Sequence, residues 1–341
     1  MAEALNDLLK ATSRSFYLTL RVLPAAVRPQ IGLAYLLART TDTIADTESV
    51  PLPLRLHALG LLRERILGLR QEPGNFTELM RHQELPAERK LLEQVETSLA
   101  RLPELSPADQ GMVRTVLDVI TGGQRLDLQR FTGASAGNII ALQNDAEMDD
   151  YTYRVAGCVG EFWTQICRAH VFPKAKLDDQ QLLADGIRFG KGLQLINILR
   201  DLPKDLRNGR CYLPADRLAA AGLKPADLLS PEHEGKLRPL YDQYLDLAEA
   251  HLTAGWAYTN TLPWRCLRVR LACAWPVLIG AETIRRLRSG NVLDARQRIK
   301  VSRRTVRGIL LRSLACYPLP GAWQSLFQTS RKAVASDGQL A

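Results

Sequence analysis

A stripe of polar side chains runs along an otherwise apolar segment between Gly190 and Pro214. Its members are amides and aspartates separated by three, four and four residues: Gln194, Asn197, Asp201 and Asp205. At about 100° per residue, this spacing keeps the four side chains within roughly 80° of one another on one helix face. A solvated surface helix is the alternative, but such faces usually mix Lys with Glu. The stripe therefore indicates a functional face.

The segment from Leu33 to Glu48 repeats this chemistry. Its aromatic, its cation and its two carboxylates follow an i, i+4, i+7, i+11 course: Tyr35, Arg39, Asp42 and Asp46. One pair of aspartates four residues apart is a weak signal, because like charges at that spacing repel each other. Two such pairs on separate apolar helices indicate carboxylate clusters held together by a hard divalent cation. We expect Mg²⁺ that coordinates a diphosphate.

Hydroxyl and guanidinium groups precede an apolar segment near the N-terminus, at Thr12, Ser13 and Arg14. A hydroxyl in this position can cap a helix. Together with the guanidinium and the N–H groups of the helix start, it can also bind a phosphate. These residues alone leave both interpretations open.

Small residues interrupt a later helical run at Ala156, Gly157 and Gly160. Gly costs a helix about 1 kcal/mol relative to Ala, so we expect a compensating gain. Either a neighbouring helix packs closely, or the helix wall leaves room for a bulky apolar ligand. The nearby Tyr151 is either a buried structural tyrosine or, beside a diphosphate, a group that accepts a proton.

The elements that must position these residues are expected to be helices. The 341 residues are 46% hydrophobic but only 6% aromatic, and they are rich in Leu, Ala and Arg. No Gly/Ser-rich or Pro-rich linker divides the chain. We therefore predict one all-α domain over residues 1–341, with a flexible tail at about residues 329–341.

Cysteine usage and hydropathy predict a cytoplasmic protein. The six cysteines are scattered without a CxxC pair, and the start of the chain carries no secretory signal. The longest apolar run, Leu271 to Ile279, is far shorter than the ~20 residues of a spanning helix. A peripheral association with a membrane surface, where an apolar product could leave, remains open.

The formal net charge of +9 permits nucleic acid, an anionic membrane or an anionic substrate as partner. Basic residues are densest between Arg265 and Arg312, where the aromatic interleaving and zinc-finger spacing of nucleic-acid modules are absent. We therefore expect no nucleic acid partner. A basic helical protein that binds nucleic acid or anionic lipid is the rival class, and it leaves both acidic stripes unexplained.

Four ordered motifs resemble those of the squalene/phytoene synthase family. They are TSRSF at Thr12–Phe16, DTIAD at Asp42–Asp46, YxxxVAGxVG at Tyr151–Gly160 and QxxNxxRDxxxD at Gln194–Asp205. The match covers nearly the whole chain. The resemblance implies an isoprenoid synthase fold, a single all-α helical bundle around a central active-site cavity. It also implies that the two Asp-rich helices face each other across Mg²⁺ and diphosphate.

The resemblance also implies roles for individual residues. The metal, Mg²⁺ or alternatively Mn²⁺, would be held by Asp42, Asp46, Asn197, Asp201 and Asp205. The substrate diphosphate would be bound by Ser13, Arg14, Tyr35, Arg39, Gln194, Asn197 and Arg200. The catalytic residues would be Tyr151, Arg39 and Arg200, with Tyr151 removing the proton that closes the cyclopropane of presqualene diphosphate.

Two later stretches resemble the members of the family that make squalene. LACAWP contains Cys273 and Pro276, and IKVSRR places Lys300 and Arg303 where those members carry a basic cofactor-binding loop. The resemblance thus implies that two farnesyl diphosphate molecules are joined head-to-head and reduced with NADPH, or alternatively NADH, to squalene. The cofactor phosphates would be bound by Arg14, Arg39, Arg200, Lys300 and Arg303.

Alternatives to this interpretation stay open, and the chain departs from the family pattern in places. Presqualene diphosphate, dehydrosqualene and phytoene are the alternative products, and a solvated basic turn is the alternative for Lys300 and Arg303. Ala45 stands where an acidic residue is usual, and Pro203–Lys204 interrupts the second aspartate motif.

Overall fold

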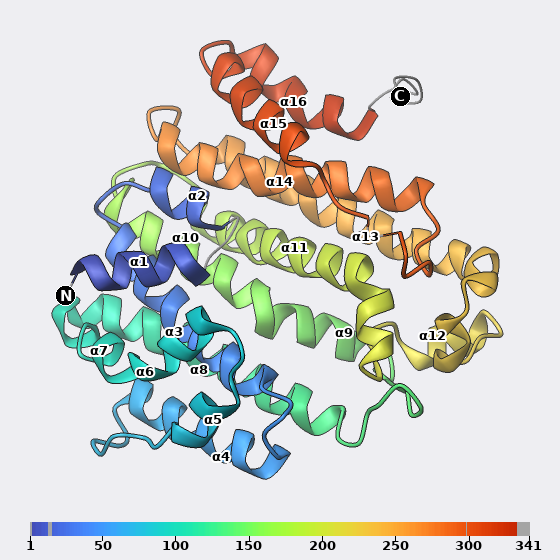
Figure 1. The fold of residues 1–341 in the computed structure, drawn as a ribbon. Coiled ribbons are helices and arrows are strands. Elements are labelled where there is room, and N and C mark those ends of the chain that lie inside the picture. Colours follow the sequence, from blue (N-terminus) through green and yellow to red (C-terminus); the bar gives the residue numbers. More distant parts are fainter. Residues whose placement is uncertain (1, 13–15, 298, 333–341) are drawn as a thin grey trace. The chain divides into compact units, whose positions relative to one another are not determined.

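The computed structural model describes residues 2–12, 16–297 and 299–332 (Figure 1). These residues form helices joined by short connections, with one pair of two-residue strands. The prediction of an all-α fold is therefore confirmed. Along the described part of the chain, every helix is too short or too polar to cross a bilayer. The chain divides into two compact units, residues 1–132 with 158–176 and residues 133–157 with 177–341.

Unit 1 contains the first aspartate motif. Its helices are α1 (Ala2–Thr12), α2 (Phe16–Val22), α3 (Arg28–Asp46), α4 (Leu52–Leu67), α5 (Thr77–His82), α6 (Pro86–Glu93), α7 (Val95–Leu99), the 3₁₀ turn η1 (Leu102–Glu104), α8 (Pro107–Arg130) and α10 (Cys158–His170). Helix α8 contacts α3, α4 and α10, so it is the core element of the unit.

A buried carboxylate fixes α3 and α10 on α8. Ser106 caps α8 by accepting the N–H of Asp109, which lies in the first turn of the helix. Asp109 is only 3% exposed, and its carboxylate accepts a hydrogen bond of 3.1 Å from Gln30 on α3. Its other oxygen lies 2.7 Å from Nε2 of His170 on α10. The helix that carries the first aspartate motif is thus attached to the core of unit 1.

Unit 2 contains the second aspartate motif and the Tyr151 motif. Its elements are β1 (Ile140–Ala141), α9 (Asp145–Thr152), the π-helical turn η2 (Tyr153–Gly157), α11 (Asp179–Arg207), β2 (Arg210–Cys211), α12 (Ala215–Ala220), the 3₁₀ turns η3 (Pro225–Leu229) and η4 (Pro231–His233), α13 (Glu234–Thr261), α14 (Leu267–Ser289), α15 (Arg303–Cys316) and α16 (Pro320–Lys332). Helix α11 packs along α13, and α14 contacts both. The strands pair in parallel, with Ile140 opposite Arg210.

The first residues of the predicted tail, 329–332, are helical, because α16 continues to Lys332. Residues 333–341 lie outside the described residues. The prediction of one domain over residues 1–341 stays a prediction.

Glycines let α11 approach its neighbours closely. A Cβ on Gly190 would lie 2.1 Å from the backbone oxygen of Ala156 in η2, far inside van der Waals contact. A Cβ on Gly192 would lie 2.8 Å from Cβ of His251 on α13. At Ala156 and Gly157, therefore, the small residues allow close helix packing, which was one of the two sequence-based interpretations.

Candidate active site

The polar stripe predicted on α11 is present. Gln194, Asn197, Asp201 and Asp205 are all partly exposed. The apolar residues between them are buried, namely Leu195, Ile196, Ile198, Leu199 and Leu202. An amphipathic helix normally presents a mixed charged face to solvent, whereas this face carries amide and carboxylate oxygens. The arrangement provides a row of oxygen donors along one side of the helix.

Arg200 is bound to the first aspartate of this stripe. Its Nε and Nη2 donate to the two carboxylate oxygens of Asp201 at 3.0 and 2.6 Å, a two-point contact typical of Arg and carboxylate. These hydrogen bonds are the main cause of the raised pKa of Arg200, and the negative charge of Asp205 adds to it. The Arg200 side chain remains about one third exposed, so it can also bind an anion.

The second set of predicted residues lies on α3. Asp42 is partly exposed and Asp46 is exposed, four residues further along the helix. Arg39 lies 3.7 Å from Asp42 and also donates to Glu88 on α6, so two carboxylates hold its guanidinium. The hydroxyl of Tyr35 donates to the backbone oxygen of Thr12 at 3.1 Å, which joins α3 to the end of α1.

The ionised form of Asp42 is disfavoured by its surroundings. Burial of the carboxyl and, next, repulsion from Asp46 raise its pKa to about 7, although Arg39 and Gln124 act in the opposite direction. The Asp42 side chain is nevertheless 45% exposed to solvent, so a ligand can reach it. A divalent cation placed against Asp42 and Asp46 would remove this repulsion.

Gln124 on α8 belongs to this site, although the sequence did not assign it a role. Its Nε2 donates to Oδ1 of Asp42 at 2.6 Å. Its own Oε1 is buried and has no hydrogen-bond partner among the described residues. A buried carbonyl oxygen that lacks a hydrogen-bond partner and lies beside a carboxylate is suited to coordinate a cation, or to accept a hydrogen bond from a water bound to a cation. In the sequence, Gln124 follows the Gly122–Gly123 pair, which thins the helix; the close approach of a ligand and packing against another helix explain this pair equally well.

The oxygen donors fit Mg²⁺ in part. Among the residues that the structure describes, no group of three or more His, Cys, Asp or Glu side chains could hold a metal ion. Mg²⁺ usually binds one or two protein carboxylates and takes its other ligands from water and substrate phosphates. The pair Asp42 and Asp46, and the pair Asp201 and Asp205, are therefore each suited to Mg²⁺ that arrives with a diphosphate.

Tyr151 lies on α9, and its ring stacks on that of Tyr212 with centroids 4.6 Å apart. Tyr212 is 6% exposed, whereas Tyr151 is partly exposed. Stacking fixes the ring plane of Tyr151, so the position of its hydroxyl is determined by the packing of unit 2. This geometry is compatible with proton transfer and equally with a structural role.

The remaining predicted residues are less well defined. Ser13 and Arg14 lie outside the described residues. Lys300 is exposed, and its backbone oxygen accepts a hydrogen bond of 3.1 Å from Arg286. Arg303 is also exposed and opens α15, which Ser302 caps. By charge these two side chains fit phosphate groups.

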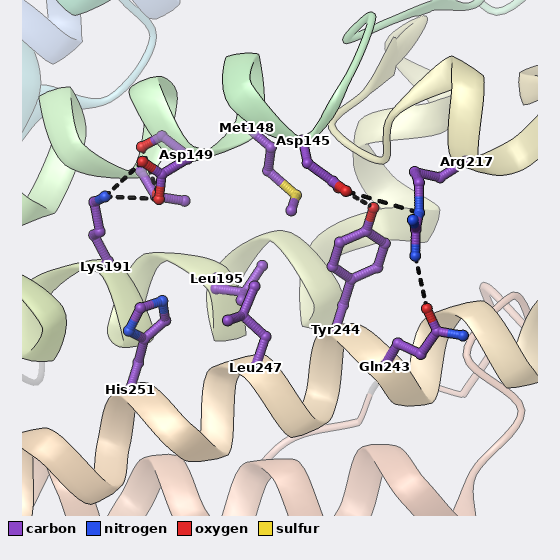
Figure 2. A pocket seen from close by; sticks show the side chains of 11 residues that line it. Asp145, Met148, Asp149, Lys191, Leu195, Arg217, Gln243, Tyr244, Leu247 and His251 are labelled. Atoms are coloured by element: carbon purple, nitrogen blue, oxygen red, sulfur yellow. Dashed lines mark hydrogen bonds and ion pairs between the residues drawn. The ribbon is translucent and has the colours of Figure 1, made fainter.

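A cavity of about 310 Å³ in unit 2 contains none of the predicted site residues (Figure 2). Ion pairs lie at both ends of it. At one end Lys191 contacts Asp149 at 2.6 Å, and at the other the Tyr244 hydroxyl donates to Asp145, which also lies 3.7 Å from Arg217. The wall between the two ends is apolar, with Met148, Leu195 and Leu247. The lining also contains His251, whose Nδ1 is buried without a hydrogen-bond partner among the described residues. Because the charged groups at both ends are already paired, we regard the cavity as part of the scaffold.

Comparison with known proteins identifies the family. The model of the family described as "Squalene/phytoene synthase" matches residues 9–305 of this chain. The chain belongs to the squalene/phytoene synthase family. Members of this family condense prenyl diphosphates head-to-head and typically use Mg²⁺.

Individual relatives differ in the product that their names state. The chain is 28% identical to squalene synthase ERG9 of Saccharomyces cerevisiae over 229 residues, which are 67% of this chain and 49% of that protein. It is 29% identical to phytoene synthase of Arthrospira platensis over 243 residues, 67% of this chain and 65% of that protein. The chain thus spans about half to two thirds of the length of these relatives.

Solved structures share the fold. The chain matches a complex of TcSQS with the ligand E5700 at a TM-score of 0.76 and 20% identity, covering 98% of this chain and 92% of that one. It matches a dehydrosqualene synthase in complex with a ligand at a TM-score of 0.65 and 21% identity, covering 92% and 95%. The helical architecture predicted from the sequence is therefore that of squalene synthase structures.

Proposed function

We propose that this protein joins two farnesyl diphosphate molecules head-to-head through presqualene diphosphate and reduces the product with NADPH to squalene. The observation that carries the condensation step is the stripe on α11, where amide and carboxylate oxygens stay accessible on a helix whose other side is buried. Polar groups that are retained in this way on a core helix suit a ligand with a metal and phosphates.

The aspartates and arginines bind the diphosphate that leaves. Asp42 and Asp46, and likewise Asp201 and Asp205 with Asn197, hold Mg²⁺, which when bound neutralises the charge of the departing diphosphate. Arg39 and Arg200 donate to phosphate oxygens. Both guanidiniums are already oriented by carboxylates, so little side-chain freedom is lost on binding. Ser13, Arg14, Tyr35 and Gln194 complete the proposed diphosphate contacts.

Tyr151 removes the proton that closes the cyclopropane ring. The coupling gives a carbocation that loses a proton to form presqualene diphosphate, and the electron pair of that C–H bond forms the new C–C bond. A tyrosine hydroxyl accepts such a proton when a diphosphate oxygen takes the hydroxyl's own proton. Stacking on Tyr212 supports this role because it holds the hydroxyl in a fixed place.

Lys300 and Arg303 bind the phosphates of NADPH, which when bound supplies the hydride for the reduction. The support is the charge and exposure of both residues at the start of α15. Arg14, Arg39 and Arg200 are the further proposed contacts to cofactor phosphates.

A second candidate is the same condensation without reduction, which ends at presqualene diphosphate, dehydrosqualene or phytoene. It is supported by the sequence comparison, because a phytoene synthase is 29% identical to this chain and a squalene synthase 28%. In fold the chain is more similar to TcSQS than to the dehydrosqualene synthase, with TM-scores of 0.76 and 0.65. The aspartate stripes are needed for both candidates, so they do not distinguish them.

The deciding experiment is product extraction after incubation of the full chain with farnesyl diphosphate and Mg²⁺, with and without NADPH. We expect squalene with NADPH, and presqualene diphosphate or dehydrosqualene with alcohols without it. A product that contains no squalene at saturating NADPH would establish the second candidate, and geranylgeranyl diphosphate as substrate then tests for phytoene.

A variant pair tests the cofactor contacts. Lys300→Ala combined with Arg303→Ala should raise the NADPH concentration needed for squalene without slowing diphosphate release. Arg296→Ala, which removes an exposed cation from the same stretch, is the matched control and should leave the NADPH requirement unchanged.

A further inference from the structure

Unit 1 contains a cavity that no step of the proposed reaction uses. Its volume is about 310 Å³, which lies at the lower end of the range for small-molecule sites. The lining comes from the end of α4, from α7 and the turn after it, and from α8 (Figure 1). It includes one arginine from α4, one from the turn after α4 and one from α8, namely Arg65, Arg70 and Arg114. We call this site the arginine cavity.

The three guanidiniums have more donors than the surrounding protein satisfies, because each carries five N–H groups. Arg65 donates to the backbone oxygen of Arg70 at 3.0 Å and to the carboxylate of Glu96. Arg114 donates from Nε to the backbone oxygen of Ile66 at 3.2 Å. The Nε groups of Arg65 and Arg70 are buried and have no hydrogen-bond partner among the described residues. Buried donors in this state are unfavourable unless a ligand or a water accepts from them.

The charge of the arginine cavity is positive. The lining contains three arginines and one carboxylate, that of Glu96, which leaves a formal charge of +2. Glu72 also approaches Arg70, but its oxygen is 3.6 Å from Nε and its side chain is 73% exposed, so water screens this pair. The carbonyl end of α4 contributes a partial charge of only about −0.5. The surrounding groups therefore do not neutralise the three guanidiniums.

The rest of the arginine cavity offers these guanidiniums little competition from other acceptors. Leu99 and Leu102 are 7% and 3% exposed, and both line the cavity. Such an apolar wall lowers the local dielectric, which strengthens the attraction between a cation and an anion. Gly68 ends α4 with φ 77°, and a Cβ there would lie 3.7 Å from Nη2 of Arg114. Because glycine has no side chain, the Arg114 guanidinium stays uncovered on this side.

We propose that the arginine cavity binds a small phosphorylated anion, whose oxygens accept hydrogen bonds from Arg65, Arg70 and Arg114. Guanidiniums bind phosphate oxygens by two-point contacts. A tetrahedral phosphate presents oxygens in several directions, so one group can accept from α4, from the turn and from α8 together. A carboxylate has two oxygens in one plane and can satisfy fewer of these donors. The site is separate from the aspartate motifs and independent of the product that the enzyme makes.

The test is calorimetric titration of the full chain in EDTA with inorganic phosphate, inorganic diphosphate and dimethylallyl diphosphate. Without a metal, the aspartate pairs of α3 and α11 repel these anions. At least one of the three should bind about tenfold or more tightly than acetate at the same ionic strength. Tightest binding of dimethylallyl diphosphate would show that the apolar wall holds an organic chain, whereas equal binding of inorganic diphosphate would show that the phosphoryl group is sufficient.

Variants locate the binding. Arg70→Gln and Arg114→Gln should each weaken it about tenfold or more. The Arg70 side chain is 37% exposed, so its replacement leaves the core intact. The matched control is Arg101→Gln, because Arg101 follows the lining residue Ala100 but pairs with Glu104 at 2.9 Å. This control should bind the anion like the unchanged protein, and thermal unfolding verifies that each variant is folded.

Two further measurements separate the arginine cavity from the active site. Arg39→Gln combined with Arg200→Gln should leave the affinity measured in EDTA unchanged. Hydrogen exchange should show that the anion protects backbone amides at residues 68–71 and 100–103.

Two outcomes would overturn the proposal. The first is that none of the three anions binds more tightly than acetate. The second is that an anion binds, but with an affinity that Arg70→Gln leaves unchanged and the combined Arg39 and Arg200 variant reduces.

Discussion

The hydroxyl of Tyr241 donates to the backbone oxygen of Leu199 at 2.9 Å, and this oxygen is the one that Pro203 leaves without its helical donor. Residue 203 of a regular helix would donate its N–H to residue 199, but proline has none. Tyr241, on α13, is fully buried and supplies the missing hydrogen bond. Helix α11 therefore continues past Pro203 to Asp205, and both aspartates of its motif stay on one helix.

Tyr241→Phe should lower the free energy of unfolding by about 1–3 kcal/mol, because a buried carbonyl loses its partner. In a chain that already carries Pro203→Ala, the same change should cost less, since the introduced alanine restores the helical N–H. Thermal unfolding of the four proteins measures both effects. Equal losses in the two backgrounds would show that the hydroxyl has no connection with the proline.

Gly190→Ala should prevent normal packing of α11 on η2. The new Cβ would meet the backbone oxygen of Ala156 at 2.1 Å, and backbone cannot move aside as a flexible side chain can. We expect a loss of several kcal/mol of stability, or no folded protein. The control is Gly60→Ala within α4, where nothing lies within 4 Å and stability should rise by about 0.5–1 kcal/mol. Similar melting temperatures for the two variants would contradict this packing.

Asp42→Asn and Asp201→Asn should each slow diphosphate release by at least about 100-fold, or about 2.7 kcal/mol of barrier, while the protein stays folded. Both side chains are partly exposed, so neither supports the core. Asp246→Asn, which alters an exposed carboxylate paired with Arg288, is the control and should keep full activity. Full activity in EDTA would remove the metal from the proposed mechanism.

Tyr151→Phe should retain diphosphate binding but form the cyclopropane about 100-fold more slowly, since only the hydroxyl is removed and the stack on Tyr212 survives. Quench-flow analysis of presqualene diphosphate measures this step, and Tyr153→Phe serves as the neighbouring control. Unchanged turnover would leave Tyr151 with a structural role.

His251 should make the protein less stable in mild acid. Burial, and next the positive charge of Arg188, lower its pKa from 6.5 to about 4. The unfolded chain therefore binds a proton that the folded chain does not, so stability is lost as pH falls from about 6.5 towards 4. Melting temperatures across this range should fall less steeply for His251→Gln. Parallel curves for the two proteins would show that His251 does not contribute.

The spacing of the residues was enough to predict which polar side chains share one face of α11 and which share one face of α3. Helix geometry alone fixes which side chains share a face. It also predicted an all-α fold, since a chain rich in Leu and Ala without strand alternation favours helices. The small residues at Ala156 and Gly157 left two interpretations, and the close approach of Gly190 decides between them at these two positions.

Contacts between residues distant in sequence could not be predicted. Gln124 donates to Asp42 across 82 positions, and Tyr241 donates to Leu199 across 42. Neither pair leaves a periodic signal, because each depends on which helices pack together. The raised pKa of Asp42 likewise comes first from burial, which spacing does not report.

The two units are interleaved along the chain, because α10 returns to unit 1 after the chain has entered unit 2 at Gly133. During synthesis α8 emerges well before α10, its packing partner, and α10 brings the buried residues Phe162 and Ile166. A ribosome that has made only residues 1–132 thus holds a chain whose central helix still exposes an apolar face. A gene fragment cut at that boundary would encode an aggregation-prone piece rather than an independent half of the enzyme.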